Sequence, residues 1–295
     1  MSRTRAGLTS RAATTAAVLI ALLWTTPTLG LLVSSFRPEK DIKTSGWWTV
    51  FGAPRLTLDN YAEVLAGGRN SSGRFADHLV NSVVITVPSV LFPLVLALLA
   101  AYALAWIDFR GRDALLVGVF ALQIVPLQMA LVPLLRLASA GWLSLPGGDP
   151  AGAARFGPIW FAHTAFALPF AVFLLHNHLA SLPRNLIESA RVDGASHGTL
   201  LLRIVLPLAR PALAALAVIQ CVWVWNDLLV ALALSGGTAE TAPVTVRLAE
   251  LAGTRGNEWQ RLTAGAFVSA SVPLLAFFAL QRHVTRGLMA GAVKG

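Results

Sequence analysis

The amino-acid sequence predicts an all-α polytopic membrane protein with six transmembrane helices. Of its 295 residues, 56% are hydrophobic and only 13% are charged, whereas about a quarter of the residues in a soluble globular protein are charged. The mean hydropathy is +0.67. The chain therefore has too few charges to cover a surface that faces water, and lipid must solvate part of it.

Six apolar stretches are long enough to form these helices. A span needs about 20 mainly apolar residues, because the hydrocarbon core is about 30 Å thick and an α-helix rises about 1.5 Å per residue. The first stretch follows three arginines, as in a signal peptide, but it exceeds the usual apolar core of about 7–15 residues. We therefore expect a retained helix there. The predicted spans are residues 12–33, 79–106, 115–137, 156–179, 212–234 and 262–280.

The basic residues of the chain are interpreted as topological. The formal charge of +9 comes from 23 Lys and Arg, which stand in short clusters between the apolar stretches. No basic tract is interleaved with aromatic residues, so we expect no nucleic-acid partner. Six spans place both termini on one side of the membrane. Lys and Arg are divided almost equally between the two sides, so the positive-inside rule favours cytoplasmic termini only weakly.

One long loop, residues 180–211, joins the fourth and fifth predicted spans. Ser181 and Pro183 are helix-start signals and the pair Asp193-Gly194 is a stop signal, which predicts a short helix of about three turns. Apolar side chains at positions 186, 187 and 190 fall on one face of that helix. Either a partner covers this apolar face, or the helix lies on the membrane or packs under the bundle.

The same loop carries a motif with a fixed spacing. Glu188-Ser189-Ala190, three further residues and Gly194 are followed after nine residues by Ile204-x-Leu206-Pro207. This pattern resembles the signature of binding-protein-dependent ABC importer permeases, with Ser189 where that family usually has Ala. The resemblance implies that the loop forms a coupling helix that docks on a cytoplasmic ATPase subunit. The residues assigned to ATPase coupling are Glu188, Ser189, Ala190, Asp193, Gly194, Ile204, Leu206 and Pro207.

Two residues of this motif carry expectations about the backbone. We expect Gly194 to adopt a positive φ in the sharp turn after the short helix, because glycine tolerates that conformation. We expect Pro207 to end a second short segment before the fifth span, because proline interrupts helices.

Further segments resemble maltose-type carbohydrate permeases. The resemblance implies a type I ABC importer permease fold in a bacterial inner membrane, with both termini and the long loop in the cytoplasm. It also implies four kinds of partner: a second, non-identical permease, two cytoplasmic ABC ATPase subunits, an extracytoplasmic sugar-binding protein and the membrane lipid. It implies no cofactor, and we expect no metal site. The segments that carry it are residues 35–39, 56–61, 81–82, 225–227 and 281–295.

These expectations divide the chain into three parts. Residues 1–78 hold the N-terminal tail, the first span and an extracytoplasmic loop. Residues 79–281 form the permease core with its cytoplasmic loop 180–211, and residues 282–295 form a cytoplasmic tail.

Polar residues inside the predicted spans are candidates for the translocation path, because they are costly in a membrane. The alternative for each is a hydrogen bond between helices, worth roughly 0.6–2 kcal/mol. The candidates are Asn81, Gln128, Gln220, Asn226 and Asp227.

Two other classes of function are considered. A proton-coupled secondary transporter would use Asp227 as its titrating group. A membrane-embedded enzyme or assembly scaffold is disfavoured, because the sequence contains no HExxH, GxSxG or GxxxxGK[ST] motif. The chain is accordingly predicted to be a transporter subunit and not an enzyme, with ATP hydrolysed on a separate chain.

Overall fold

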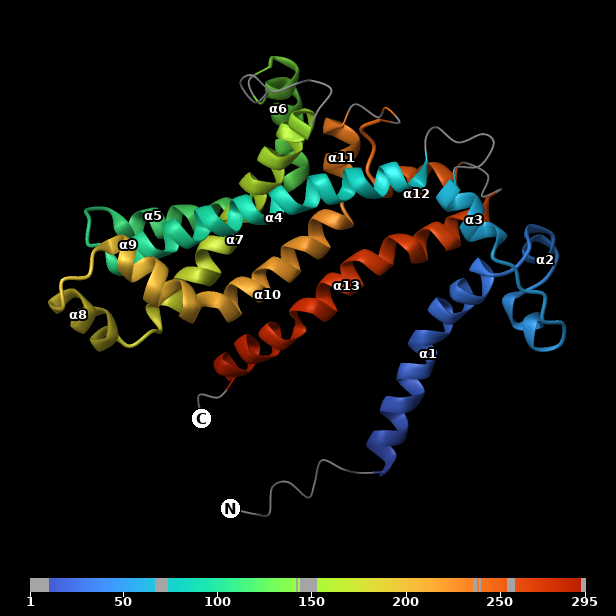
Figure 1. The fold of residues 1–295 in the computed structure, drawn as a ribbon, viewed down its shortest axis with the longest axis horizontal. Coiled ribbons are helices and arrows are strands. Elements are labelled where there is room, and N and C mark those ends of the chain that lie inside the picture. Colours follow the sequence, from blue (N-terminus) through green and yellow to red (C-terminus); the bar gives the residue numbers. More distant parts are fainter. Residues whose placement is uncertain are drawn as a thin grey trace. The chain divides into compact units, whose positions relative to one another are not determined.

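The computed structural model describes residues 11–66, 74–141, 143, 153–235, 238, 240–253 and 258–292, and within these ranges every regular element is helical. Figure 1 shows the order of the helices along the chain. The chain forms two compact units, Met1–Ala76 with Leu248–Ala270, and Asp77–Arg247 with Ser271–Gly295. Each unit is described by itself.

The first unit contains one long apolar helix and a folded loop. Its elements are α1 (Arg11–Ser35), α2 (Glu39–Thr44), η1 (Trp47–Phe51), α3 (Asp59–Ala66) and the first turns of α13 (Trp259–Ala292). The buried Arg37 guanidinium donates hydrogen bonds to the Gly46 carbonyl at 2.9 Å and to the Ser45 hydroxyl at 2.7 Å. The Asn60 amide donates to the carbonyls of Ser35 and Arg37 at 2.9 and 2.8 Å. These bonds hold the loop that follows α1 in place, because they give the buried side chains of Arg37 and Asn60 the hydrogen-bond partners that buried polar groups need.

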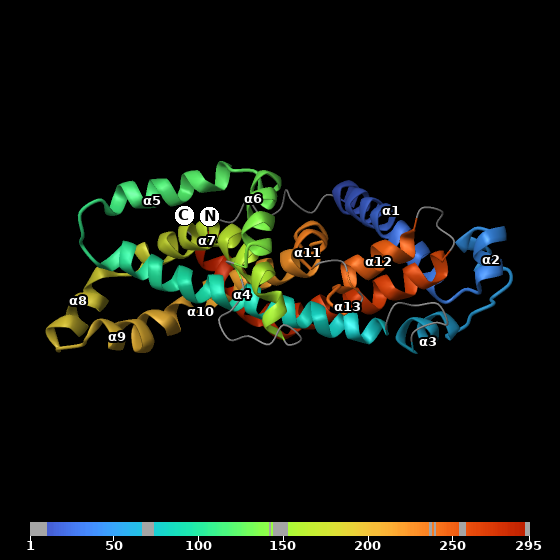
Figure 2. The ribbon, with the colours of Figure 1, turned by 90° about the horizontal axis from the view of Figure 1, so that it is seen from above.

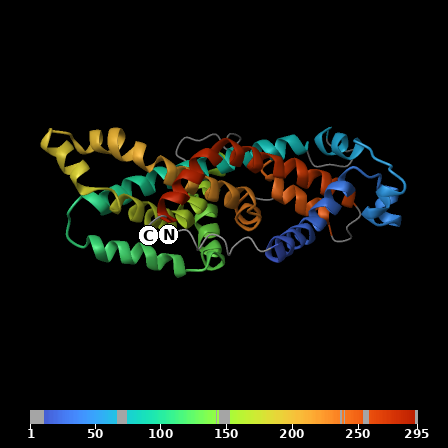
Figure 3. The same cartoon turned by 90° about the horizontal axis from the view of Figure 1, so that it is seen from below.

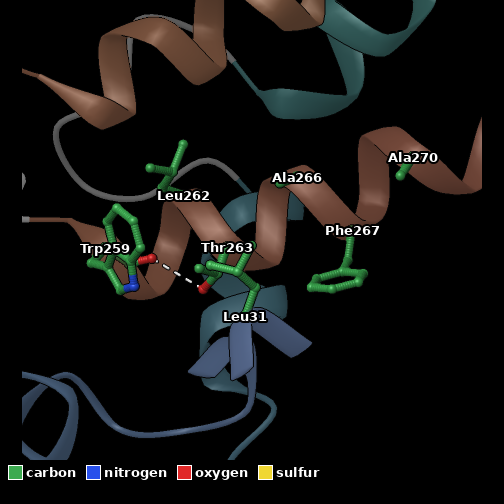
Figure 4. A pocket seen from close by; sticks show the side chains of 7 residues that line it. All are labelled: Leu31, Trp259, Leu262, Thr263, Ala266, Phe267 and Ala270. Carbon is green, nitrogen blue, oxygen red and sulfur yellow. Dashed lines mark hydrogen bonds between the residues drawn. The ribbon is translucent and has the colours of Figure 1, made fainter. Parts of the chain in front are cut away.

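An apolar groove of about 330 Å³ lies between α1 and the first turns of α13 (Figure 4). Leu31 of α1 faces the side chains of α13 across it. The Thr263 hydroxyl does not offer a polar contact to the groove, because it donates to the carbonyl of Trp259 at 3.0 Å. The groove is lined by Leu31, Trp259, Leu262, Thr263, Ala266, Phe267 and Ala270.

The second unit is a bundle of long helices joined by shorter ones. Its core is formed by α4, α7 and α10, where small residues such as Ala101, Ala171 and Ala209 are buried and let the helices approach closely. Its elements in chain order are α4 (Phe75–Trp106), α5 (Arg112–Ala121), η2 (Leu122–Ile124), α6 (Leu127–Ser139), η3 (Ala153–Phe156), α7 (Gly157–Ala180), α8 (Arg184–Val192), α9 (His197–Leu200), η4 (Leu201–Val205), α10 (Leu206–Trp225), α11 (Leu229–Leu234), α12 (Val244–Ala252) and the rest of α13.

The membrane-spanning segments confirm a multi-pass, all-α protein. Among the described residues, five helices are long and apolar enough to cross a membrane, and a sharply bent helix pair makes six if it is counted as one span. The five are Ala12–Ser35, Phe75–Trp106, Gly157–Ala180, His197–Trp225 and Trp259–Ala279, and the bent pair is Arg112–Ile124 with Leu127–Ser139.

The predicted third span, residues 115–137, is a sharply bent pair of helices in the structure. The two halves of the bent pair make an angle of 96°, and Figures 2 and 3 show the chain turning sharply from α5 into α6. The break lies at Pro126, and Val125 before it has extended dihedral angles, φ −70° and ψ 118°. Proline lacks the backbone N–H that a helix needs and disfavours helical geometry in the preceding residue.

The predicted fifth span is also shifted, and Pro207 does not end a segment. The spanning helix runs without interruption over His197–Trp225, and the chain leaves it nine residues before the predicted end at residue 234. Pro207 lies in the first turn of α10, directly after the π-helical turn Leu201–Val205. A π-helical turn alters the local hydrogen-bond ladder, and a proline in the first turn of the helix beyond it is tolerated without a break.

Candidate functional site

The motif-bearing loop folds as the short helix α8 followed by a sharp turn. α8 begins after Pro183 and ends at Val192, and Gly194 has φ +86°, as expected. The N–H of Gly194 donates to the carbonyl of Arg191, and the N–H of Ala195 donates to that of Ala190, both at 3.0 Å. This pair of bonds is a Schellman motif, which satisfies the last carbonyls of the helix and requires a left-handed residue at position 194.

The apolar face of α8 is divided between the chain's own core and the surface. Ile187 is 3% exposed and belongs to the core cluster of the bundle, and Ala190 packs against that cluster. Leu186, on the same face, is 41% exposed, whereas Val192, which is 87% exposed, lies on the opposite side of the helix. One part of the face is thus covered by the bundle, and another part remains open for a partner.

The other motif residues are split in the same way. Glu188, Ser189 and Asp193 are exposed, whereas Ile204 packs against the core cluster. Leu206 and Pro207 are half-buried in the first turn of α10. The polar half of the motif therefore faces water beside α8, and the apolar half forms the start of the spanning helix.

The polar candidates in the spans do not meet at one site. Gln128 and Asn226 are exposed, and the Asn226 amide donates to the carbonyl of Val222 in its own helix at 2.8 Å. Gln220 is buried. Among the candidates, Asn81 and Asp227 both form hydrogen bonds with the stretch from Glu240 to the first turn of α12.

Asn81 has a structural role in this conformation. Its amide donates to the carbonyls of Glu240 and Ala242 at 2.9 and 3.1 Å. The hydroxyl of the neighbouring Ser82 accepts the N–H of Val244 at 2.8 Å. These bonds hold the irregular backbone before α12 against α4, where its polar groups would otherwise lack partners.

Asp227 stands at the junction between α10 and α11. Its carboxylate accepts the N–H of Ala231 at 3.0 Å, as a cap of the first turn of α11, and its carbonyl accepts the Thr245 hydroxyl at 2.7 Å. The carboxylate is 3.8 Å from Nε2 of His163, and both side chains are largely buried. The expectation that Asp227 lies within its span is thus wrong, because α10 ends at Trp225.

A small cleft adjoins this junction and contains groups that the sequence analysis did not single out. Ser82, Thr86, His163, Asp227 and Thr245 contribute its polar lining. The position of His163 within the predicted span 156–179 was an available signal, since an ionisable residue in a membrane helix is costly and needs a partner. Among the described residues, no group of three or more His, Cys, Asp or Glu side chains is placed to hold a metal ion.

The comparisons with known proteins cover almost the whole chain. Residues 64–289 match the family described as binding-protein-dependent transport system inner membrane component. The chain is 48% identical to the osmoprotective compounds uptake permease protein GgtD of Synechocystis sp., over 95% of this chain and 90% of that protein. It is 47% identical to the alpha-glucoside transport system permease protein AglG of Rhizobium meliloti, over 90% of this chain and 67% of that protein.

A solved structure has the same fold. A chain of a bacterial ABC transporter involved in the import of the acidic polysaccharide alginate superposes with a TM-score of 0.67 at 21% identity. The match covers 92% of this chain and 94% of that chain. At this identity the likeness establishes the fold and carries no statement about the substrate.

Proposed function

The chain belongs to the family of binding-protein-dependent transport system inner membrane components, and on this premise we propose that it is a permease subunit of an ATP-driven importer for a sugar or sugar-like solute. The observation that carries the proposal is the identity of 48% and 47%, over 95% and 90% of this chain, to two permeases whose names specify osmoprotective compounds and alpha-glucosides.

The rest of the transporter is assigned to other chains. The sequence contains no GxxxxGK[ST] motif, so ATP binding is assigned to two cytoplasmic ABC ATPase subunits. Leu186, at the edge of the face that Ile187 buries in the bundle, and Val192, on the other side of α8, supply exposed apolar side chains for docking such a subunit. A second, non-identical permease completes the pathway, and an extracytoplasmic binding protein delivers the solute. This arrangement places the loop 180–211 and both termini in the cytoplasm.

A proton-coupled transporter is the second candidate. The observation that favours it is the buried pair of Asp227 and His163, whose carboxylate oxygen and Nε2 atom are 3.8 Å apart. Against it, the carboxylate of Asp227 already caps α11. Protonation of Asp227 during transport would weaken this cap in every cycle, because it removes the charge of the accepting carboxylate.

Reconstitution separates the two candidates. The chain alone, and the chain with its partner permease, ATPases and binding protein, are placed in proteoliposomes, and uptake of a radiolabelled alpha-glucoside is measured. We expect uptake only by the complete assembly, and only when ATP is present on the side of the membrane that holds the ATPase subunits. Uptake by the chain alone, or uptake driven by an imposed proton gradient without ATP, would refute the importer.

A further inference from the structure

Three side chains from separate elements meet at one end of the bundle. Tyr102 is buried near the C-terminal end of α4, and its hydroxyl lies 2.9 Å from Nδ1 of His197, the first residue of α9. Nε2 of the same imidazole lies 2.8 Å from a guanidinium nitrogen of Arg191 on α8. Figures 1 and 2 show α8 and α9 beside this end of α4.

The chemistry of these groups fixes the direction of both hydrogen bonds. A guanidinium can only donate, so Nε2 of His197 accepts from Arg191. The neutral imidazole then carries its proton on Nδ1 and donates it to the Tyr102 hydroxyl. The Tyr102 and His197 rings also pack edge to face, with centroids 6.0 Å apart and an interplanar angle of 83°. His197 therefore joins α8 to α4 through two directed bonds and a ring contact.

These bonds supply what the apolar contact of α8 lacks. Ile187 anchors α8 to the same core cluster that contains Tyr102 and Leu200. An apolar contact is non-directional, so it holds a helix against the bundle but resists sliding and rotation weakly. Hydrogen bonds through a rigid aromatic ring resist both, because they weaken steeply when their angles change.

The other part of α4 reaches the junction described above. α4 is one helix over Phe75–Trp106, and Ser82 and Tyr102 lie about 30 Å apart along it at about 1.5 Å per residue. Asn81 and Ser82 hold the backbone that leads into α12. α4 therefore connects the Tyr102 end to the segment beside Asp227 through one helix, with Pro88 and Pro93 between them.

We propose that Arg191, His197 and Tyr102 are positioning residues that lock α8 to α4, so that displacement of α8 by a docked ATPase moves α4. None of the three belongs to the fixed positions of the loop motif, and Tyr102 lies outside the loop altogether. The proposal rests on the proposed function, since it needs an ATPase to displace α8.

The test uses the complete transporter in proteoliposomes, with solute uptake and ATP hydrolysis measured in the same vesicles. Tyr102→Phe keeps the buried ring and removes only the hydroxyl, and His197→Ala removes the link. Ser89→Ala is the matched control, because it also deletes a buried hydroxyl from α4, one for which the described residues offer no hydrogen-bond partner.

We expect Tyr102→Phe to lower the amount of solute moved per ATP about fivefold, as the loss of one hydrogen bond predicts. His197→Ala should lower it on the order of tenfold, because a bond to a charged group is lost as well. Adding Tyr102→Phe to His197→Ala should have no further effect, since both act through one link. Ser89→Ala should leave the ratio unchanged.

Several results would overturn the proposal. Parallel losses of uptake and hydrolysis, with an unchanged ratio, would mean that the residues only support folding. Additive effects in the double variant, or loss of ATPase from purified Tyr102→Phe complexes, would also contradict positioning through His197. If the unmodified complex itself failed to couple uptake to ATP, the proposed function would have failed, and this outcome is visible without any variant.

Discussion

Replacing Gly194 by valine should stop transport while the protein stays in the membrane. Gly194 has φ +86°, and a Cβ atom built there would meet nothing within 4 Å. The cost of the substitution is therefore conformational and not steric with respect to neighbours. A β-branched residue held in this region costs about 2–3 kcal/mol, which corresponds to about a 30- to 150-fold shift away from the native turn. The Schellman bonds to Ala190 and Arg191 would be lost with it.

Asparagine is the matched control at this position, because it tolerates the left-handed region better than other non-glycine residues. Uptake and ATP hydrolysis are measured in reconstituted complexes, and co-purification reports whether the ATPase still binds. We expect Gly194→Asn to keep most of the uptake and Gly194→Val to lose it, through weaker docking or uncoupled hydrolysis. Normal uptake with Gly194→Val would refute the reasoning, because it would show that the geometry of this turn does not matter for transport.

The remaining predictions concern the surface of α8, the topology and the junction. Glu188→Arg reverses an exposed charge beside the open part of α8, and should abolish transport by weakening ATPase docking; full assembly with normal transport would contradict this. With Cys221 replaced by Ser, an impermeant thiol reagent should label Ala53→Cys but not Ser196→Cys in intact cells; labelling of the latter would invert the topology. Asp227→Asn keeps an oxygen that can cap α11 and removes the charge, so ATP-driven uptake should persist within a few-fold. Complete loss, measured in the same uptake assay, would favour the proton-coupled alternative.

The spans could be predicted because apolar length is a local property, but their breaks could not. Pro126 lies inside the predicted third span and Pro207 is predicted to end a segment before the fifth span, yet only Pro126 breaks a helix. Pro126 follows a short 3-10 turn and separates α5 from α6 at 96°, whereas Pro207, in the first turn of α10, lies inside the continuous helix His197–Trp225. Each proline leaves a carbonyl of the preceding turn without its helical N–H partner. Whether the helix continues depends on whether that carbonyl finds another partner in the folded chain, and the sequence around the proline does not determine this.

The motif in the loop predicted α8 and its turn, because helix-start and helix-stop signals act over a few residues. It did not predict that Ile187 faces the bundle while Leu186 and Val192 face outward. The apolar pattern shows only that a face must be covered. Which side chains the chain's own core covers depends on the position of α8 relative to α4 and α7.

The polar residues show the same limit over longer separations. The hydrogen bond between Tyr102 and His197 joins residues 95 positions apart, and the contact of His163 with Asp227 joins α7 to the junction between α10 and α11. A charged residue in an apolar stretch indicates that a partner exists, but not which one. In this chain Asp227 is satisfied mainly by its own backbone cap, and His197, outside any fixed motif position, connects the loop to the bundle. In our proposal, movement is transmitted through Tyr102, Arg191 and His197, which a search for charged residues inside the spans does not find. The ratio of solute moved to ATP hydrolysed is the measurement that tests their role.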